Sequence, residues 1–468
     1  MRADILREKL VNNEIDIDKY YEDLIKKVED KKSLNIFISF DENLIKERIE
    51  KLKNKKNNNE KLGKLFGVPV SLKDNISYTE MRMTCGSKML EDFTPVFNAT
   101  VVEKLLKEDA VIFGKVNMDE FAMGSSSETS YYGVTKNPLD EKLIPGGSSS
   151  GSAVSVAADL VPISLGTDTG GSVRQPAAFC NVVGYYPSYG TISRHGVVSM
   201  ANTLDQVGIV ANSVKEVVDT VNIIGGKDLK DMNTTLKENL DFNLDENYTL
   251  KGKKIGIVDM EEFGMDETTK ADYEKAIEDL KNLGAEIVEL EFDYLKYSSP
   301  VYNVVMSCEA SSNLSRFDGI RYGYLTDDYK TTRELYVNTR SEGFGEEVQR
   351  RIAMGTHYLS ADNGKKLYKQ GLKVRRLLMD EFNSKFDKVD FIATPTVTEL
   401  PYEIGSRLED PLAVYDSGTF NVAVNLAGLC AISVPVREGI SGSLQFIGKR
   451  NEDEKMLNAA YAYERRDA

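Results

Sequence analysis

The segment GTDTGGSVRQPAAF, residues 166–179, gathers residue types that could attack a carbonyl group. Ser172 follows two glycines, which let the backbone turn tightly and bring its N–H groups toward a reacting atom. A serine hydroxyl attacks efficiently only when a neighbouring base takes its proton. The segment therefore predicts serine-based acyl transfer, provided that the chain supplies a base.

Histidine is the usual base for such a serine, but the chain has only two, His195 and His357. Neither lies in a distinctive motif, and the G-x-S-x-G turn of the α/β-hydrolases is absent around Ser172. Lys73 is the alternative, because it ends the apolar run GVPVSLK, where burial would lower the pKa of its amine. A neutral lysine is a competent base, although a lysine at a strand end is also a common surface residue. The residues alone leave these three candidates open.

A second cluster of glycine and serine, PGGSSSGSA, begins at residue 145 and contains Ser148. It runs directly into an apolar segment with helical character, and backbone N–H groups at a helix start can face an anion or a developing charge. The alternatives are a flexible linker and a phosphate-binding loop. The cluster lacks the G-x-x-x-x-G-K-[ST] spacing of a phosphate loop. We interpret it as a catalytic loop.

Three segments in this order and at these intervals, VSLKDNI, PGGSSSGSA and GTDTGGSVRQPAAF, resemble the amidase signature family. The resemblance implies a Ser–cis-Ser–Lys triad. Ser172 would be the nucleophile and Lys73 the base. Ser148 would bridge the two, and its peptide bond to Gly147 would be cis. The family likeness thus favours Lys73 over the two histidines.

The same resemblance gives the Gly-Gly turn a second role. The N–H groups of Thr169, Gly170, Gly171 and Ser172 would converge on the oxyanion of a tetrahedral intermediate. One such donor typically lowers a barrier by ~3 kcal/mol. We therefore predict an oxyanion hole at Thr169, Gly170 and Gly171.

Further segments resemble one branch of this family, the A subunits of glutamyl-tRNA(Gln) amidotransferases, from about residue 61 to about residue 449; they include NMDEFAMGSSSETSYYG, EASSNLSRFDGIRYG and FNVAVNLAGLCAISVP. The resemblance implies that the chain hydrolyses glutamine and supplies ammonia for the conversion of Glu-tRNA(Gln) to Gln-tRNA(Gln). The implied partners are the B and C subunits of a heterotrimer, which would hold most of the tRNA. ATP and Mg²⁺ would act in the partner, and this chain would carry no cofactor and no metal.

Three positions match the glutamine-binding residues of that branch. Tyr302 would line the pocket, Arg351 would pair with the α-carboxylate, and Asp416 would pair with the α-ammonium group. A zwitterion requires one cation and one anion at a fixed separation, and the arginine fork suits a carboxylate. Arg350 is adjacent to Arg351 and is the alternative partner of the carboxylate.

The chain departs from the common pattern of the branch at four positions, none of them in the triad: Ser150, Tyr186, Thr191 and Ser443. Two other functions remain as alternatives. One is a free-standing amidase of the same family that acts on small amides, and the other is a non-catalytic scaffold on the amidase fold. The presence of all three triad residues argues against the scaffold.

The elements that must position these residues alternate along the chain. Residues 1–60 are expected to form an N-terminal helical segment, and residues 61–468 the catalytic domain. Apolar runs of strand length alternate with helical periodicity, most clearly in KKIGIVD, TKADYEKAIEDLKNLG and AEIVELEF. Such alternation predicts an α/β fold with a mixed or mostly parallel sheet. The family resemblance implies the amidase signature fold, with a central mixed β-sheet covered by helices on both faces.

Composition sets the remaining bounds. Acidic residues exceed basic ones and give a net charge of −15, which is a poor electrostatic match for a polyanion such as tRNA. The four cysteines are scattered and predict buried, reduced thiols rather than a zinc site or disulfides. No apolar stretch is long enough to span a membrane, and the charged N-terminus lacks the features of a secretory signal. We therefore expect a cytoplasmic protein.

Overall fold

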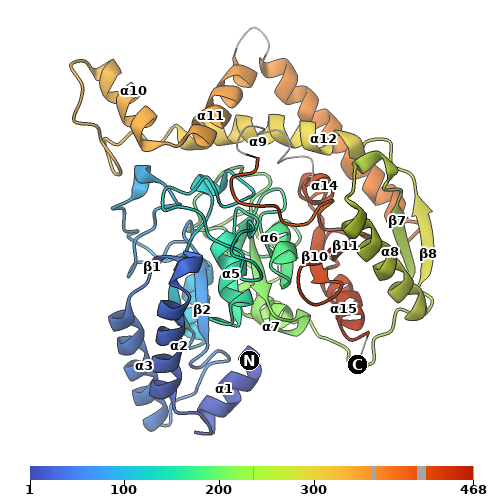
Figure 1. The fold of residues 1–468 in the computed structure, drawn as a ribbon, viewed down its shortest axis with the longest axis horizontal. Coiled ribbons are helices and arrows are strands. Elements are labelled where there is room, and N and C mark those ends of the chain that lie inside the picture. Colours follow the sequence, from blue (N-terminus) through green and yellow to red (C-terminus); the bar gives the residue numbers. More distant parts are fainter. Residues whose placement is uncertain (236, 361–363, 408–417, 467–468) are drawn as a thin grey trace.

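A computed structural model describes residues 1–235, 237–360, 364–407 and 418–466 of the chain (Figure 1). Its described strands form one mixed sheet in the order β1-β3-β2-β4-β6-β5-β10-β11-β9-β7-β8. Their bounds are β1 Phe37–Ser39, β2 Pro69–Lys73, β3 Val111–Val116, β4 Ile163–Asp168, β5 Val183–Tyr186, β6 Gln206–Ala211, β7 Lys254–Val258, β8 Glu286–Leu290, β9 Phe391–Pro395, β10 Cys430–Pro435 and β11 Ser443–Gly448. Parallel pairs lie toward both ends of the sheet and antiparallel pairs in its middle. The predicted α/β class and mixed sheet are confirmed.

Helices cover both faces of the sheet. Their bounds are α1 Ala3–Val11, α2 Ile17–Asp30, α3 Glu42–Asn57, α4 Thr100–Lys107, α5 Ser150–Ala157, α6 Arg174–Phe179, α7 Val214–Ile224, α8 Glu267–Asn282, α9 Ser298–Leu314, α10 Thr332–Gly343, α11 Glu346–Leu359, α12 Gly364–Phe386, α14 Thr419–Ala427 and α15 Asp453–Glu464. One apolar core joins the sheet to α4, α7, α8 and α15. The opposite face carries α5 and α6 over one part of the sheet, and α9, α12 and α14 over the part formed by β9, β10 and β11.

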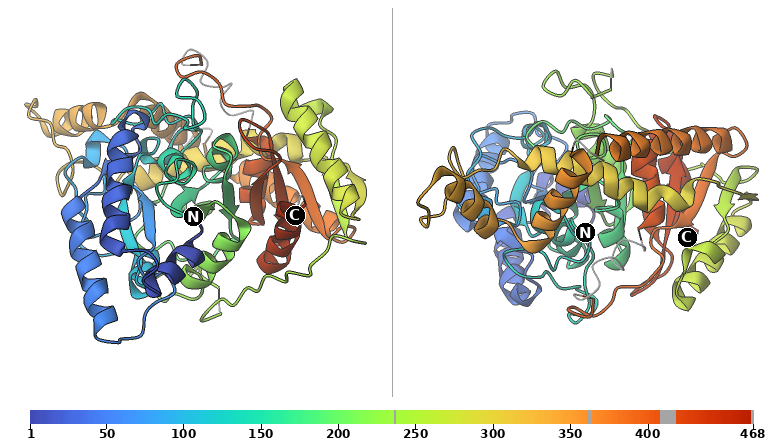
Figure 2. Two further views of the ribbon diagram at one scale, coloured as in Figure 1. Left: turned by 60° about the horizontal axis from the view of Figure 1, so that its bottom comes forward. Right: turned by 90° about the horizontal axis from the view of Figure 1, so that it is seen from above.

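The N-terminal helices α2 and α3 lie at the end of the molecule opposite to β7 and β8 (Figures 1 and 2). The sequence predicts helices here, and the structure adds one element that the sequence analysis did not anticipate. Strand β1 pairs with β3 in antiparallel register and forms an edge of the sheet. Three residues are too few to show the period-two alternation that identifies a strand in a sequence.

Strand alternation decides which side chains face the catalytic loops. Val70 and Leu72 of β2 enter the core beneath α4 and α7, so Ser71 and Lys73 point to the opposite face, toward α5. Asp168 likewise ends β4 on that face, where it meets Arg174 of α6. Two neighbouring apolar strands, β2 and β4, therefore deliver a lysine and an aspartate to the same buried face.

Two composition-based predictions can be compared with the described residues. All four cysteines are free and buried there, as the sequence predicts. Within the same residues, each helix is either too short or too polar to traverse a lipid bilayer.

Candidate active site

Lys73 and Ser148 are in direct contact in the interior of the molecule. Lys73 Nζ donates to Ser148 Oγ at 2.7 Å, to Ser149 Oγ at 3.0 Å and to the carbonyl of Thr167 at 3.3 Å. The peptide bond between Gly147 and Ser148 is cis, as the family resemblance implies. The lysine at the end of β2 is therefore joined to the loop that precedes α5.

Ser172 lies on the adjoining loop, between β4 and α6. The N–H of Ser149 donates to the carbonyl of Ser172 at 3.0 Å and ties the two loops together. Ser172 is 8% exposed and lines a small cavity of about 40 Å³. A hydrogen bond between the Ser148 and Ser172 hydroxyls is not among those of the described residues. The structure thus contains the Lys73–Ser148 contact and presents Ser172 to the cavity.

Burial has a large effect on the base candidate. Lys73 is fully buried, and loss of solvation lowers the pKa of its amine to about 7, against the opposing influence of Asp119, Asp168 and Asp205. A large fraction of the amine is therefore neutral near pH 7. A neutral amine hydrogen-bonded to a serine is able to accept a proton from it.

Ser149 is a contact of the lysine that the sequence analysis missed. Its hydroxyl accepts from Lys73 and donates to the Thr167 carbonyl at 3.0 Å. It holds the amine at the end of β2 without facing the cavity. Its position next to Ser148 in PGGSSSGSA could have suggested this contact. The sequence alone, however, does not show which of the consecutive serines faces the lysine.

The backbone between Gly170 and Ser172 needs both glycines. Gly171 has a φ of +113°, a conformation that side chains rarely adopt, and a Cβ there would lie 2.7 Å from the Cβ of Asn421. A Cβ on Gly170 would lie 2.7 Å from the ring of Tyr302. The Gly171 N–H already donates to Asp168 Oδ1 at 2.8 Å. The N–H groups of Gly170 and Ser172 have no acceptor among the described residues.

A buried ion pair supports this loop from beneath. The Asp168 carboxylate accepts from Arg174 Nε and Nη2, both at 3.0 Å, and from the N–H of Val173 at 3.2 Å. Both side chains are fully buried. Burial alone would raise the pKa of Asp168, but Arg174 and the hydrogen bonds outweigh it, so the pKa lies below its usual value. The charged carboxylate therefore fixes the start of the turn that carries Ser172.

Replacing Arg174 should destabilise the fold strongly. Arg174→Met would leave the Asp168 charge buried without its cation, and such a loss costs about 3–5 kcal/mol. Urea unfolding followed by circular dichroism should show this decrease in the free energy of unfolding. A decrease below about 1 kcal/mol, the range of exposed pairs, would contradict a structural role for this ion pair.

The cavity beside Ser172 contains two of the three predicted glutamine-binding residues. Tyr302 of α9 and Arg351 of α11 line it, whereas Asp416 lies outside the described residues. Arg351 is buried, and its Nε pairs with Glu347 Oε1 at 2.6 Å. Arg350 donates to both oxygens of Glu347 and is not among the described lining residues. Of the two candidate arginines, the structure places Arg351 at the cavity.

Sequence reasoning missed most of the polar lining. The further described side chains there are Ser125, Gln175, Ser299, Asn303 and Asn421. Gln175 belongs to the same motif as the nucleophile, and its Oε1 accepts from the N–H of Gly147 at 3.2 Å. The others come from distant segments, and only the fold brings them together.

The two histidines lie away from this cavity. His195 packs against Phe97 with ring centroids 5.0 Å apart, and His357 is exposed on α11. Neither is among the described residues that line the cavity beside Ser172. Lys73 is therefore the base candidate that the fold places next to the serines.

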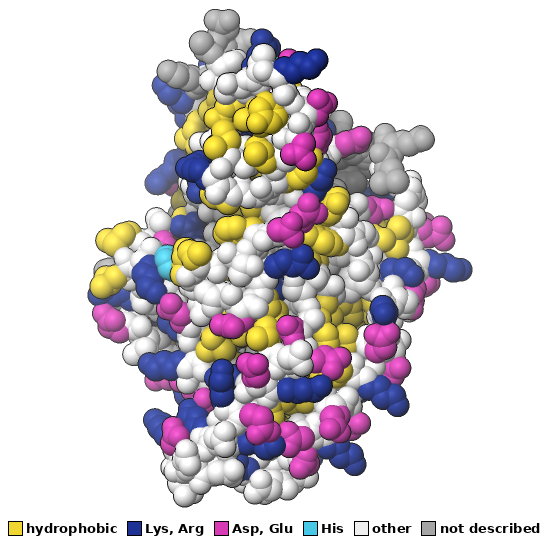
Figure 3. All heavy atoms as spheres, turned by 90° about the vertical axis from the view of Figure 1, so that its left-hand side faces the viewer, with side chains coloured by type: hydrophobic (Ala, Val, Ile, Leu, Met, Phe, Trp, Pro, Cys, Tyr) yellow, Lys and Arg dark blue, Asp and Glu magenta, His cyan; other side chains and the backbone are white. Residues whose placement is uncertain are grey.

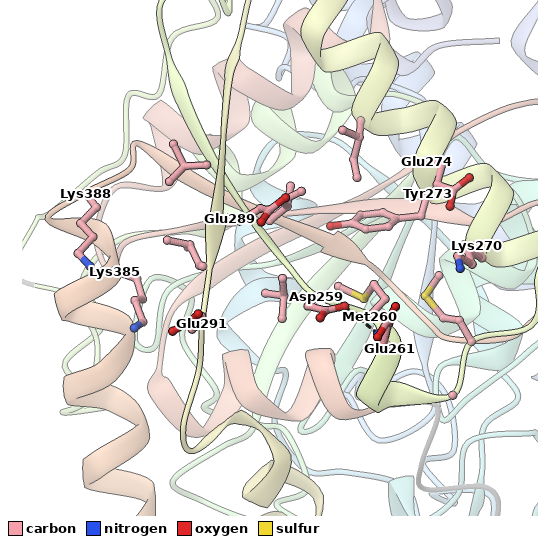
Figure 4. Close-up of a pocket in the computed structure, with 17 residues that line it drawn as sticks. Asp259, Met260, Glu261, Lys270, Tyr273, Glu274, Glu289, Glu291, Lys385 and Lys388 are labelled. Atoms are coloured by element: carbon pink, nitrogen blue, oxygen red, sulfur yellow. Dashed lines mark hydrogen bonds between the residues drawn. The ribbon is translucent and has the colours of Figure 1, made fainter.

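A much larger groove, of about 1020 Å³, lies elsewhere, between α8 and the carboxyl ends of β7 and β8 (Figure 4). Acidic side chains and lysines face it, among them Asp259, Glu289, Glu291, Lys270 and Lys385. Serine, threonine, cysteine and histidine are missing from its described lining. Its described lining offers no serine, threonine or cysteine nucleophile, so the smaller cavity at Ser172 is the candidate active site.

Comparison with known proteins gives consistent matches over nearly the whole chain. The family described as Amidase matches residues 20–457. The chain is 44% identical to the A subunit of the glutamyl-tRNA(Gln) amidotransferase of Caldanaerobacter subterraneus subsp. tengcongensis, over 98% of this chain and 95% of that protein. It is 45% identical to the protein of that name from Staphylococcus saprophyticus, over 97% of this chain and 94% of that protein.

Solved structures agree with these matches. The crystal structure of the A subunit of the glutamyl-tRNA(Gln) amidotransferase from Thermotoga maritima superimposes with a TM-score of 0.78 at 37% identity, covering 98% of this chain and 91% of that one. A bacterial aryl acylamidase of the amidase signature family has a TM-score of 0.86 at 22% identity, which shows the shared fold. The expected resemblance to the amidase signature family, and to its A-subunit branch, is confirmed.

Proposed function

The chain belongs to the amidase family, and on that premise we propose that it is the glutaminase component of a glutamyl-tRNA(Gln) amidotransferase. The observation that carries this proposal is the buried contact between Lys73 and Ser148 beside a cavity that contains both Ser172 and Arg351. The relatives of that name, at 44–45% identity over nearly the full length, support the choice of substrate.

In the proposed reaction, Ser172 attacks the carboxamide carbon of glutamine. Its proton passes to Ser148 Oγ while the Ser148 proton passes to the neutral amine of Lys73, and a Ser172–carbon bond forms. The carbonyl oxygen becomes an oxyanion that faces the N–H groups of Gly170 and Ser172. Return of the proton through Ser148 to the nitrogen breaks the carbon–nitrogen bond and releases ammonia. Water then cleaves the γ-glutamyl ester and restores Ser172.

Recognition of glutamine rests on charge. The Arg351 guanidinium is buried and offers a planar fork that suits the α-carboxylate. Glu347 Oε1 accepts from both Arg350 and Arg351, and so Glu347 holds Arg351 in place. Tyr302 forms the wall next to Gly170, and Asp416 is assigned to the α-ammonium group.

Ammonia is useful only if it reaches a second reaction before it is lost to water. We assign that reaction to partner B and C subunits in a heterotrimer, with ATP and Mg²⁺ acting in the partner and no cofactor in this chain. The net charge of −15 supports tRNA binding mainly by the partner. Residues 320–343, which include α10, expose five large apolar side chains: Ile320, Leu325, Tyr329, Tyr336 and Val337. Figure 3 shows hydrophobic side chains on that face. Exposed apolar side chains of this kind suit a contact between subunits.

Arg351→Ala should raise the KM for glutamine roughly 100-fold, because the α-carboxylate would lose a charged, bidentate partner in a buried cavity. Arg350→Ala is the matched control, because it removes an equal charge from the same helix while leaving the cavity intact. Steady-state kinetics of ammonia release would compare the two. A larger effect from Arg350→Ala would reverse the assignment.

The same experiment can separate glutamine recognition from assembly. In the complex reconstituted with its partner subunits, Arg351→Ala should still form Gln-tRNA(Gln) when an ammonium salt replaces glutamine, because the partner's chemistry is untouched. Failure with ammonium would mean that Arg351 serves assembly or folding. Asp416→Ala should behave as Arg351→Ala does if it holds the α-ammonium group.

A further inference from the structure

Asp119 is a buried carboxylate beside the candidate triad, and none of the ion pairs within the described residues includes it. Asp119 is fully buried in the segment between β3 and η3 (Glu120–Ala122). Its Oδ1 accepts from the Thr129 hydroxyl at 2.9 Å and from the Thr129 N–H at 3.4 Å. Its Oδ2 has no hydrogen-bond donor within the described part of the chain. A half-satisfied buried carboxylate is costly and calls for a physical reason.

Asp119 touches the peptide unit that carries Ser148. The Asp119 N–H donates to the carbonyl of Ser148 at 3.3 Å. Its Oδ2 lies so close to Gly147 that a Cβ on that glycine would be 2.0 Å away. The oxygen without a described donor therefore faces the backbone of Gly147, which the cis peptide bond joins to Ser148.

Three carboxylates, those of Asp119, Asp168 and Asp205, raise the pKa of the Lys73 amine. The charge of Asp168 is already paired with a cation, and both oxygens of Asp205 already accept hydrogen bonds. Asp168 forms the buried ion pair with Arg174. Asp205 accepts from the Thr169 hydroxyl and from the N–H groups of Met200 and Ala201. Asp119 is left with one oxygen that no described donor reaches. The thiol of Cys85, which also influences the amine, is neutral because burial raises its pKa well above the usual value.

The proposed reaction creates a charge that needs a counterpart. When Lys73 accepts the proton of Ser172 through Ser148, a neutral amine becomes an ammonium ion in a fully buried site. A buried ammonium without an opposite charge is strongly disfavoured. The tetrahedral intermediate forms at the same moment, so the energy of this ammonium contributes directly to the barrier.

We propose that Asp119 is a positioning residue that supplies the counter-charge for the Lys73 ammonium formed during acylation, and that holds the Gly147–Ser148 unit in place. This inference rests on the triad of the proposed function. Asp119 is not among the described residues that line the substrate cavity, and it acts through Lys73 and Ser148. Of the three carboxylates, Asp119 raises the pKa of Lys73 the most and so opposes the effect of burial. Burial also raises the pKa of Asp119 itself, while the Thr129 hydrogen bonds, the nearby Ser127 N–H and the Lys73 amine favour its charged form.

The test compares wild type with Asp119→Asn, which keeps the size of the side chain and removes its charge. The quantity measured is the rate at which Ser172 reacts, as a function of pH. Without the carboxylate, the Lys73 pKa falls further, so the acid limb of the profile moves to lower pH by about one unit. The plateau rate falls about tenfold or more, because the ammonium in the intermediate loses its counter-charge. The ratio of wild-type to variant rates should therefore shrink as the pH is lowered. A purely structural residue would lower the whole profile and leave the limb in place.

The probe is the rate at which a fluorophosphonate labels Ser172, because this reaction needs the activated serine but not glutamine. If the fluorophosphonate labels Ser172 of the wild-type protein but the protein releases no ammonia from glutamine, the proposed substrate is wrong. The role of Asp119 can still be tested by the labelling rate in that case. Glu120→Gln is the matched control. Glu120 is an adjacent buried carboxyl whose pKa burial raises to about 7, so its own titration must be separated from that of Lys73.

Glu120→Gln should leave the acid limb where it is in wild type. A limb that stays or moves to higher pH in Asp119→Asn would overturn the proposal, as would an equal shift in Glu120→Gln. Thr129→Val serves if Asp119→Asn does not fold. It removes the 2.9 Å hydrogen bond to Asp119 and makes the carboxylate easier to protonate, so it should shift the limb in the same direction, whereas Thr129→Ser should not. No shift in Thr129→Val would also contradict the proposal.

Discussion

Ser172→Ala should lower glutamine hydrolysis roughly 10⁴-fold or more while the fold stays intact, because no other group can form the acyl intermediate. The expected loss appears in kcat, since the alanine leaves the walls that bind glutamine in place. Ammonia release measured on purified protein, with circular dichroism as the folding control, would check it. Activity within tenfold of wild type would exclude Ser172 as the nucleophile.

Lys73→Arg should lose about 10²–10⁴-fold in activity, as should Lys73→Ala, since a general base contributes that much and arginine stays protonated. In wild type, only the neutral amine accepts a proton, and its pKa is about 7. Activity should therefore be full above that pH and fall about tenfold for each unit below it. The rate of ammonia release, measured between about pH 5 and 9, would show this fall in activity on the acid side of the profile.

An active Lys73→Arg variant would point to another base. His195 and His357 are then the remaining candidates from the sequence, although neither is among the described residues that line the cavity. A flat pH profile in wild type would equally contradict a neutral lysine base. So would activity that keeps rising up to pH 9, because that is the behaviour of a base with an ordinary lysine pKa.

The triad residues could be predicted because three short segments, by their residue types, order and spacing, resemble the amidase signature family. Lys73 ends an apolar strand, Ser148 lies in a Gly/Ser loop before a helix, and Ser172 follows two glycines. The structure brings Lys73 and Ser148 together and places Ser172 on the adjoining loop. Helix and strand alternation was also enough to predict an α/β fold with a mixed or mostly parallel sheet, and the family resemblance favoured the mixed one.

Properties that depend on long-range contacts could not be predicted in this way. The Gly171 N–H, expected to face an oxyanion, instead donates to Asp168, because the Arg174 pair holds that carboxylate under the turn. The choice between Arg350 and Arg351 depends on which side of α11 meets the cavity. Asp119 lies within NMDEF, where a carboxylate in a polar segment gives no sign that it is fully buried.

The proposed reaction depends on a covalent γ-glutamyl ester between glutamine and Ser172. The most direct test is peptide mass spectrometry of wild-type protein quenched in acid during turnover with glutamine. We expect a γ-glutamyl group on the peptide that contains Ser172, and its absence from Ser172→Ala. Glutamine hydrolysis with no acyl group on that serine, or with the group on another residue, would contradict the proposed mechanism.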